Sequence, residues 1–318
     1  MRALVFGSLN IDYVYQVPHF VQRGETLAST SFQRFCGGKG LNQAIALSRA
    51  GLETRMAGAV GPEGDFLLEE LRRAEVDTGL MFRCDTPTGH AIIQNSPDGD
   101  NCILLYGGAN RAISPEMARE VLQAFGPGDL LLVQNEISAL PEIVSLGKER
   151  GMLVALNPSP MDAALVRKLL PSVDLLILNR VEAAQLLGEK SDEPRQILTK
   201  LSRLSPSTRL VLTLGAEGAL LLDRDGCISQ PAFPVRAVDT TGAGDSFTGY
   251  LLAGLLQRMS RQDALRYAAA AAALAVTRPG AAPSIPTREE TLRFLSENQD
   301  KYSFQMQLDR ERAFPLYC

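Results

Sequence analysis

The chain has 318 residues, 45% of them hydrophobic and 21% charged, with a net charge of −4, a composition typical of a globular protein with a large core. It has no Trp and no dense basic run, which argues against nucleic acid as a partner. The longest apolar stretch, 267–276, is too short for a membrane span, and the N-terminus lacks the features of a signal peptide.

Histidine and cysteine are scarce. Two His residues without ligand spacing argue against a zinc site and against a Ser-His-Asp triad. The five cysteines are scattered and form no CxxC pair. They predict free thiols and a cytoplasmic location.

Short unbroken apolar runs recur along the chain, at 3–7, 130–135, 152–158, 174–179 and 209–215. Amphipathic stretches such as 114–125 and 140–151 lie between them and predict helices. This alternation predicts an α/β sandwich in which a mainly parallel sheet is covered on both faces. Ligands bind beyond the carboxyl ends of such strands. Because polar residues follow all five runs, we expect one polar cleft there.

The first run is followed by Asn10 and Asp12, which are two residues apart. In an extended chain both side chains point to the same side. Such a pair suits hydrogen bonding to sugar hydroxyls; the alternative is a turn capped by an Asx side chain.

Two segments depart from the helix–strand alternation. Residues 13–35 alternate like a strand, and residues 88–106 are typical of a hairpin through the turn sequence PDGD. We expect them to form a small inserted β-sheet. That sheet could be a lid over the cleft, a dimerisation surface, or both.

The sequence FCGGKGLNQAIALSRAG (35–51) places glycines before a helix, with Lys39 and Asn42 in the first turn. This helix start suits a polyhydroxylated or anionic ligand; the alternative is a tight turn. The chain has no GxxxxGK[ST] motif, and no GxGxxG follows the first strand. These absences argue against a P-loop enzyme and against a nicotinamide-dependent dehydrogenase.

A second glycine-rich helix start is VDTTGAGDSF (238–247). It can be a simple helix cap or a place where a phosphate group binds. After it, the alanine-rich stretch 267–276 predicts a closely packed core helix. The terminal residues 303–318 predict a short extra helix or a mobile tail.

Taken in order, GSLNID, GGKGLNQA, GGAN, LNPSP, NRVE, LTLGAEGA, DTTGAGDSF and AVTRPGAAPS resemble the motif series of the ribokinase (PfkB) family of sugar kinases. The resemblance runs from about Ala3 to about Glu290. It implies one domain over 1–318, folded as a three-layer α/β/α sandwich, with a lid sheet from about 13–36 and 88–108. It also implies ATP-dependent phosphorylation of the primary hydroxyl of a small sugar, foremost D-ribose, by a homodimer that pairs through the lid sheet.

The resemblance implies a role for each matching residue. Asp245 would be the catalytic base, and the backbone at Gly242, Ala243 and Gly244 would be the anion hole for the γ-phosphate. Asn10, Asp12, Gly38, Lys39, Asn42 and Glu136 would bind the sugar with Asp245. Asn179, Glu182, Thr213, Gly215 and Gly218, with Gly244, would hold ATP and Mg²⁺. A K⁺ activator would bind, mostly through carbonyl oxygens, at Asp239, Thr241, Ala275, Arg278, Gly280 and Ser284.

Two residues depart from the pattern, and one of them is Ala269, which stands where the family often has a polar residue near the adenine. Many family members have an acidic residue where this chain has Arg180, which bears on how Mg²⁺ is held. Three alternatives remain open: another sugar such as deoxyribose or a ketohexose, a nucleoside of the adenosine type, or a non-catalytic sugar-binding homologue. The last alternative would predict loss of Asp245 or of the glycines at 242 and 244, and all three residues are present.

Overall fold

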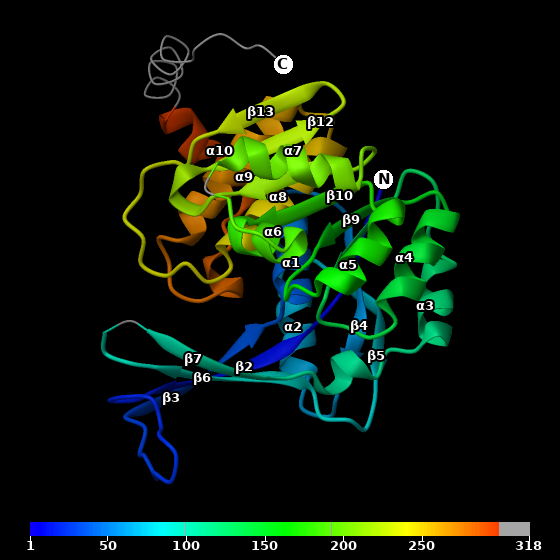
Figure 1. Cartoon of the computed structure of the whole chain (residues 1–318). Coiled ribbons are helices and arrows are strands. Elements are labelled where there is room, and N and C mark those ends of the chain that lie inside the picture. The colour runs from blue at the N-terminus through cyan, green and yellow to red at the C-terminus, as the bar shows by residue number, and fades with distance from the viewer. Residues whose placement is uncertain (99, 192, 299–318) are drawn as a thin grey trace.

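The computed structural model describes residues 1–98, 100–191 and 193–298. Within them the main sheet is built from β1 (Ala3–Phe6), β4 (Thr54–Val60), β5 (Asp77–Arg83), β8 (Leu130–Gln134), β9 (Leu153–Asn157), β10 (Leu175–Asn179), β11 (Arg209–Thr213), β12 (Ala219–Asp223) and β13 (Gly226–Gln230). Their order is β13-β12-β11-β10-β9-β8-β1-β4-β5 (Figure 1). Only β11–β12 and β12–β13 pair antiparallel. The predicted mainly parallel sheet is confirmed.

Alternate side chains of the central strands enter two separate cores. In β1, Ala3 and Val5 lie in one core, while Leu4 and Phe6 lie in the other, and all four are fully buried. The same alternation recurs in β8 and β10. Because both faces of these strands are covered, every position needs an apolar side chain. This is why the predicted runs are unbroken.

Helices cover both faces of the sheet and complete three layers (Figure 1). One layer contains α1 (Lys39–Arg49), α2 (Asp65–Arg73), α8 (Ala243–Leu256), α9 (Arg261–Ala275) and α10 (Arg288–Glu297). The other contains α3 (Pro115–Leu122), α4 (Leu140–Glu149), α5 (Ala163–Leu169), α6 (Arg180–Leu187) and α7 (Pro194–Leu204). The helices predicted at 114–125 and 140–151 are α3 and α4. The alanine-rich stretch lies in α9, where most of its side chains are buried.

Four strands of the main sheet are not among the predicted runs. β4 and β5 lie on the side of β1 away from β8, and β12 and β13 form the opposite edge. The hairpin β12–β13 has a sequence signal, since Gly226 follows the two turn residues Arg224 and Asp225 with a φ of +102°, and glycine is common at this place in hairpins. The apolar run in β4 is interrupted by Gly58, and β5 carries polar residues at its exposed positions.

The predicted inserted sheet is present and has four strands, β2 (Asn10–Gln16), β3 (Ser31–Gly37), β6 (Gly89–Asn95) and β7 (Asn101–Tyr106), in the order β3-β2-β6-β7. It lies below the main body in Figure 1. Both hairpins are antiparallel, and β2 pairs parallel with β6. Asn10 and Asp12 belong to β2 and not to the end of β1, although they do share one face as predicted.

No helix in the part of the chain that the structure describes is long and apolar enough to cross a membrane. The predicted free thiols are confirmed for Cys36, Cys84, Cys102 and Cys227, of which Cys102 is exposed and the others are partly buried. Cys318 and the predicted tail 303–318 lie outside the described residues.

Candidate active site

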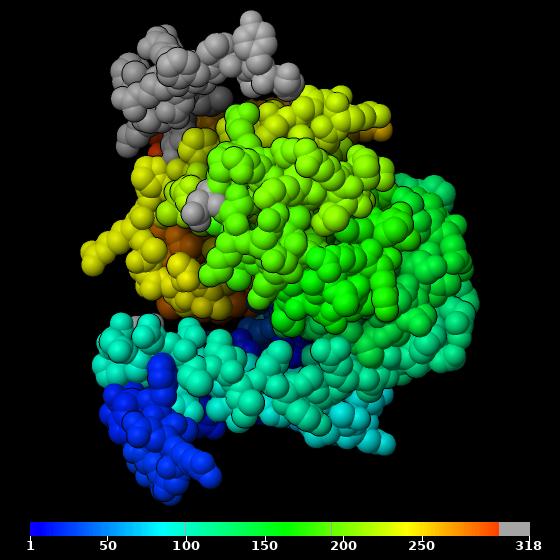
Figure 2. All heavy atoms as spheres, viewed as in Figure 1, coloured from blue at the N-terminus to red at the C-terminus, as the bar shows by residue number. Residues whose placement is uncertain are grey.

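The carboxyl ends of the parallel strands face the four-stranded sheet, and Figure 2 shows a hollow between the two. A pocket of about 110 Å³ in this region is lined by Asn10, Leu105, Gly107, Asn110, Arg111, Glu136 and Pro160. Sites for drug-sized ligands span roughly 300–1,000 Å³, so this pocket suits a small ligand. A second pocket of about 200 Å³ lies at the ends of β10 and β11. Two pockets thus lie in the region where one polar cleft is predicted.

Gly38 brings the start of α1 against the connection between β1 and β2. Its φ is +93°, and a Cβ at this position would lie 2.8 Å from the backbone of both Asn10 and Ser8. Only glycine tolerates both conditions. The close approach lets Glu136 Oε2 accept hydrogen bonds from the Lys39 backbone N–H, at 3.1 Å, and from the Ser8 hydroxyl. The structure thus brings Gly38, Lys39 and Glu136 together.

Asn10 is 4% exposed and belongs to the same pocket. Its Oδ1 accepts a hydrogen bond of 2.8 Å from Nδ2 of Asn110. Asn110 is fixed in turn, because its Oδ1 accepts from the Leu9 N–H at 3.0 Å. The Asn10 amide therefore has its Nδ2 left to donate to a ligand. Asn110 belongs to the GGAN motif, but the sequence alone assigns it no role.

Asp12 lies on the sheet close to Glu136. Burial, together with the negative charge of Glu136, raises the pKa of Asp12 to about 7. A carboxyl group that is readily protonated can both donate and accept hydrogen bonds. The Asp12–Glu136 pair therefore suits sugar hydroxyls, which also do both.

Asp245 lies in the first turn of α8 and is 6% exposed. Its Oδ2 accepts a hydrogen bond of 3.1 Å from Asn42 Nδ2, and its Oδ1 accepts one of 2.8 Å from Gln43 Nε2. Lys39 Nζ lies 3.8 Å from Oδ1. The Asp245 carboxylate raises the pKa of Lys39, and Glu136 and Glu182 add to this rise against the effect of burial. Lys39 therefore stays protonated beside Asp245.

Three buried amides connect Asp245 to the main sheet, and sequence reasoning missed all of them. Gln43 Nε2 also donates to Asn157 Oδ1 at 2.9 Å, and Gln134 Nε2 donates to Gln43 Oε1 at 2.7 Å. Gln43 and Gln134 are fully buried, and Asn157 is 8% exposed. A signal was present, because Gln43 follows Asn42 in the glycine-rich motif, and the other two are the last residues of β8 and β9.

The start of α8 has the features expected of an anion site. Gly242 is its N-cap with φ +76°, and no side chain caps the helix. The first N–H groups of a helix lack intrahelical partners and carry the positive end of its dipole. A Cβ at Gly244 would meet no atom within 4 Å, so the space in front of it is open. Ala243 N–H donates to Thr240 O at 3.3 Å. The anion hole stays a prediction.

The second pocket is lined by Asn179, Arg180, Val181, Thr213, Leu214 and Gly215. Asn179 and Glu182 form a capping box at the start of α6, with both hydrogen bonds at 2.9 Å. Arg180 turns away from them to Glu217, with Nη2 at 3.1 Å from each carboxylate oxygen. Both partners are substantially exposed, and pairs of this kind contribute about 1 kcal/mol or less. Arg180 thus leaves the capping box intact.

Thr213 and Gly215 line this pocket as predicted, and Gly218 does not. Gly218 instead closes the loop between β11 and β12, where its carbonyl accepts from Leu214 N at 2.8 Å. Its contact with a nucleotide stays a prediction.

The segments predicted to bind a monovalent cation lie side by side. Asp239 joins them, because it accepts hydrogen bonds from the backbone and hydroxyl of Thr241 and, at 2.8 Å, from Gly280 N–H. Burial opposes ionisation of Asp239, but these hydrogen bonds still hold its pKa below the usual range. Ala275 O accepts from Arg278 N–H at 3.1 Å, and Ser284 is fully buried.

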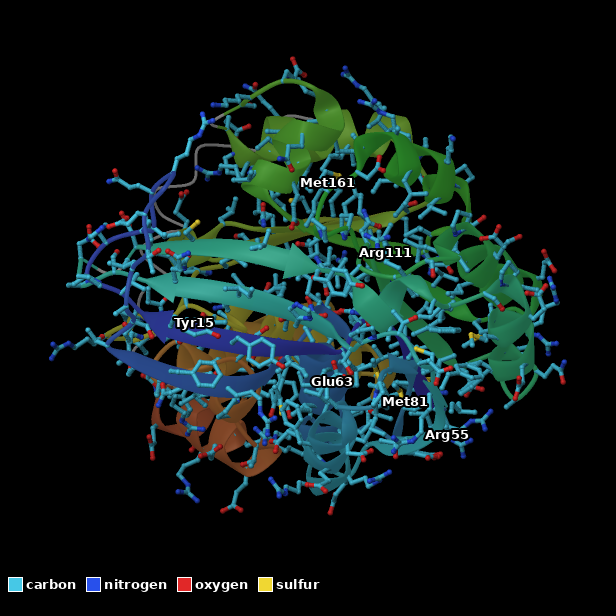
Figure 3. All side chains as sticks on the ribbon, turned by 90° about the horizontal axis from the view of Figure 1, so that it is seen from below. Tyr15, Arg55, Glu63, Met81, Arg111 and Met161 are labelled. Carbon is cyan, nitrogen blue, oxygen red and sulfur yellow. The ribbon has the colours of Figure 1, made fainter. Side chains whose placement is uncertain are left out.

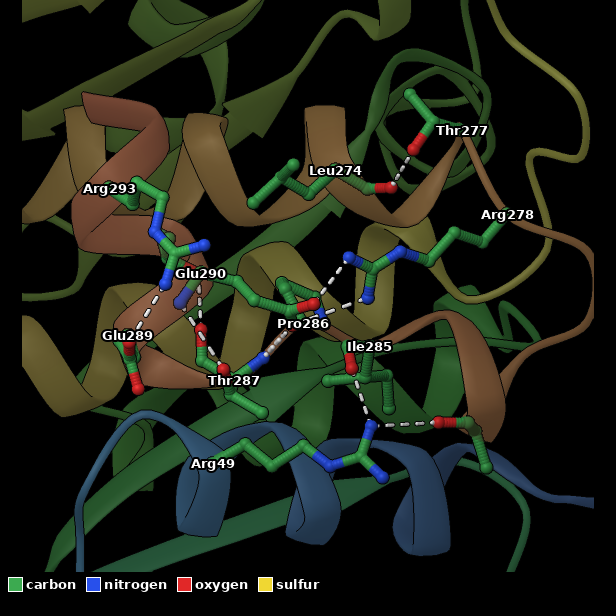
Figure 4. A network of polar contacts seen from close by, with 12 residues as sticks. Arg49, Leu274, Thr277, Arg278, Ile285, Pro286, Thr287, Glu289, Glu290 and Arg293 are labelled. Carbon is green, nitrogen blue, oxygen red and sulfur yellow. Dashed lines mark hydrogen bonds and ion pairs between the residues drawn. The ribbon is translucent and has the colours of Figure 1, made fainter. Parts of the chain in front are cut away.

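Figure 4 shows how this region is anchored. The Arg278 guanidinium binds the Glu290 carboxylate, with one contact of 2.6 Å. Arg49, the last residue of α1, donates to the carbonyl groups of Ala282 and Ile285. Helix α1 therefore begins at Lys39, beside Glu136 and Asp245, and ends on the loop predicted to hold the cation.

Among the described residues, no group of three or more His, Cys, Asp or Glu side chains could hold a metal ion. The predicted K⁺ site relies on carbonyl oxygens, and Mg²⁺ keeps several waters and needs only one or two carboxylates. Both sites stay predictions. Glu182 uses Oε2 in the capping box, so its other oxygen is the one that could reach a hydrated ion.

Comparison with known proteins decides the family. Residues 2–288 match the pfkB family carbohydrate kinase. The chain belongs to this family. It is 35% identical to the ribokinase of Haemophilus influenzae over 298 residues, which cover 92% of this chain and 97% of the relative. It is 30% identical to the deoxyribokinase of Salmonella typhi over 306 residues, covering 94% of this chain and 100% of the relative.

A solved structure agrees with these matches. Arabidopsis thaliana ribokinase complexed with ribose and ATP aligns with a TM-score of 0.83 at 30% identity, covering 92% of this chain and 98% of the other. The predicted ribokinase-like fold is thereby confirmed. As a pfkB carbohydrate kinase, the chain is an ATP-dependent sugar phosphotransferase.

Proposed function

We propose that this kinase transfers the γ-phosphoryl group of ATP to the primary hydroxyl of D-ribose and forms D-ribose 5-phosphate. The observation that carries the proposal is the position of Lys39. Its backbone N–H binds Glu136 in the small polar pocket, while its ammonium group lies 3.8 Å from the buried carboxylate of Asp245. The polar pocket at Glu136, which suits sugar hydroxyls, therefore lies next to Asp245, the candidate base. The ribokinases among its relatives support D-ribose as the substrate.

The sugar would be held by the groups already positioned around the first pocket. Asn10 offers its Nδ2, while Asp12 and Glu136 offer carboxyl oxygens. Polar groups of this kind disfavour an analogue that lacks a hydroxyl, because they would then stay unpaired. The second candidate is 2-deoxyribose, which the 30% identical deoxyribokinase suggests.

Asp245 would take the proton from the attacking hydroxyl as the new bond to the γ-phosphorus forms and ADP leaves. The N–H groups at Gly242, Ala243 and Gly244 would stabilise the charge that develops on the phosphoryl oxygens. ATP would occupy the second pocket, with Asn179 and Glu182 toward its phosphates. Mg²⁺, when bound, neutralises phosphate charge.

Glu136→Gln should raise the KM for the sugar by about 10- to 100-fold and leave the KM for ATP unchanged, because hydrogen bonds to a charged group are the stronger ones. Steady-state kinetics with each substrate varied checks this. Glu142→Gln, at an exposed position of α4, is the matched control and should change neither value. A larger effect on ATP than on the sugar would place Glu136 outside the sugar site.

Replacing Na⁺ in the buffer by K⁺ at constant ionic strength should raise kcat several-fold. We expect this because the loop tied together by Asp239 continues directly into the start of α8. Asp239→Asn should weaken the response, since an amide cannot accept from both Thr241 and Gly280. Equal rates of wild-type phosphorylation in the two salts would rule out the cation site.

We also propose that the kinase forms a homodimer through the four-stranded sheet. Figure 3 looks onto this sheet from below and shows Tyr15 on it. Its edge strand β7 exposes Ile103, Leu104 and Leu105 at 55%, 67% and 48%. Exposed apolar groups along an open edge are typical of an interface.

Adjacent residues of a strand point to opposite faces. The double variant Ile103→Glu/Leu104→Glu therefore places a charge on both faces of the sheet. It should shift the protein from dimer to monomer in sedimentation velocity. A wild-type protein that sediments as a monomer at micromolar concentration would contradict the proposed dimer.

A further inference from the structure

The amides around Asp245 form a hydrogen-bonded chain whose direction is fixed at one end. Asn157 Nδ2 donates to the backbone carbonyl of Ile177 at 2.9 Å. A carbonyl can only accept, so Asn157 must turn its Nδ2 toward Ile177 and its Oδ1 toward Gln43. Gln43 must then present its Nε2 to Asn157 and its Oε1 to Gln134. Gln134 in turn must donate from its Nε2 to Gln43 Oε1.

This direction determines what Gln43 offers to Asp245. The two hydrogens of Gln43 Nε2 go to Asn157 Oδ1 and to Asp245 Oδ1. Neither can be withdrawn without leaving a buried acceptor unpaired, which is costly. Oδ1 of Asp245 is therefore held permanently, both by this amide and by the charge of Lys39.

The other oxygen of Asp245 has a replaceable partner. Oδ2 accepts only from Asn42 Nδ2 at 3.1 Å, and Asn42 Oδ1 is buried without a hydrogen-bond partner among the described residues. Among the described residues, Asp245 Oδ2 is therefore the one group that orients the Asn42 amide. A sugar hydroxyl that takes the place of Asn42 at Oδ2 breaks this single contact, and the amide can then turn toward the sugar, which Asn42 is predicted to bind.

We propose that Gln43 is a positioning residue that holds Asp245 by Oδ1, so that Oδ2 is the atom that accepts the proton from the sugar. Gln134 and Asn157 orient Gln43 and act through it. This inference rests on the proposed role of Asp245 as the base. A donor to a carboxylate also favours its ionised form.

Gln43→Met tests the proposal, because methionine has a similar length and shape and no donor. At neutral pH we expect kcat to fall about 10- to 100-fold. The acidic limb of the pH profile of kcat/KM should move up by about one pH unit, as expected from the loss of one hydrogen bond to a charged group. Part of the lost rate should return at high pH.

Gln230→Met is the matched control. Gln230 is also buried, at 3% exposure, but its amide binds Pro231 O and Gln262. It should lower thermal stability without moving the pH profile. If Gln43→Met does not fold, Gln134→Met removes one of the two amides that orient Gln43, and it should move the limb in the same direction by less.

The outcomes separate this inference from the proposed function. An acidic limb that stays in place in both Gln43→Met and Gln134→Met would overturn the role of Gln43. Asp245→Asn, measured in parallel, tests the base itself. If that variant retains turnover, the proposed chemistry fails first; if it is inactive while the limb does not move, only the positioning role fails.

Discussion

Asp245→Asn is expected to lower kcat by about 10²- to 10⁴-fold, the range that general base catalysis contributes, while the sugar still binds. The substitution fits the surroundings. The carbonyl oxygen of the introduced amide can still accept from Gln43, and Asn42 can turn its unpaired Oδ1 to accept from the introduced NH₂ group. The loss of rate would therefore reflect the missing base and not a collapsed site. Pre-steady-state kinetics and sugar titration measure the two effects separately.

Asp129→Asn is the control for this variant. Asp129 is also a buried aspartate, 7% exposed and 2.7 Å from the Arg2 guanidinium, but it directly precedes β8 and so lies at the amino end of that strand, away from the site at the carboxyl ends. Its replacement should cost stability and leave kcat unchanged. Near-normal turnover in Asp245→Asn would remove Asp245 as the base.

Gly244→Ala should lower kcat by about 10²- to 10³-fold, the usual cost of losing one donor of an oxyanion hole. The physical reason is the approach of the γ-phosphate, which a Cβ would block. The same variant should be at least as stable as the wild type, since a Cβ meets no atom within 4 Å. Alanine is also the better helix former, by about 1 kcal/mol.

Stability and activity therefore move in opposite directions, which a merely structural glycine would not show. Gly126→Ala is the matched control, because a Cβ there meets only Arg150 O, at 4.0 Å. It should leave kcat unchanged. Thermal melts measure the stability of each variant, and steady-state kinetics measures its activity. If Gly244→Ala keeps full activity, no phosphoryl group approaches this part of α8.

The sequence predicts the fold where burial leaves a clear pattern. The central strands are covered on both faces, so their apolar runs are unbroken and all five are found. β5 is not predicted, because its side chains are mostly only partly buried and its pattern is broken. The alternating pattern of residues 13–35 and the turn sequence PDGD predict the four-stranded sheet. They do not predict that β2 begins at Asn10, because only its pairing with β3 and β6 defines the start of this strand.

For the site, the motifs indicate which residues matter and the structure indicates what they touch. Lys39, Asn42, Glu136 and Asp245 come from distant parts of the chain and do lie together. Gln43, Gln134 and Asn157 stand at marked places in the sequence, next to Asn42 and at two strand ends, but their role follows only from their partners in space. Likewise, only the contact with Glu217 shows where Arg180 points.

The measurement that tests the central claim most directly is kcat/KM with ATP for D-ribose, 2-deoxy-D-ribose, a ketohexose and adenosine, followed by ADP release in the presence of K⁺. We expect D-ribose to have the highest value, at least about 10²-fold above 2-deoxy-D-ribose, and ³¹P NMR to place the phosphate on the primary hydroxyl. A higher kcat/KM for any of the other three acceptors, or a phosphate at another position, would contradict the proposed function.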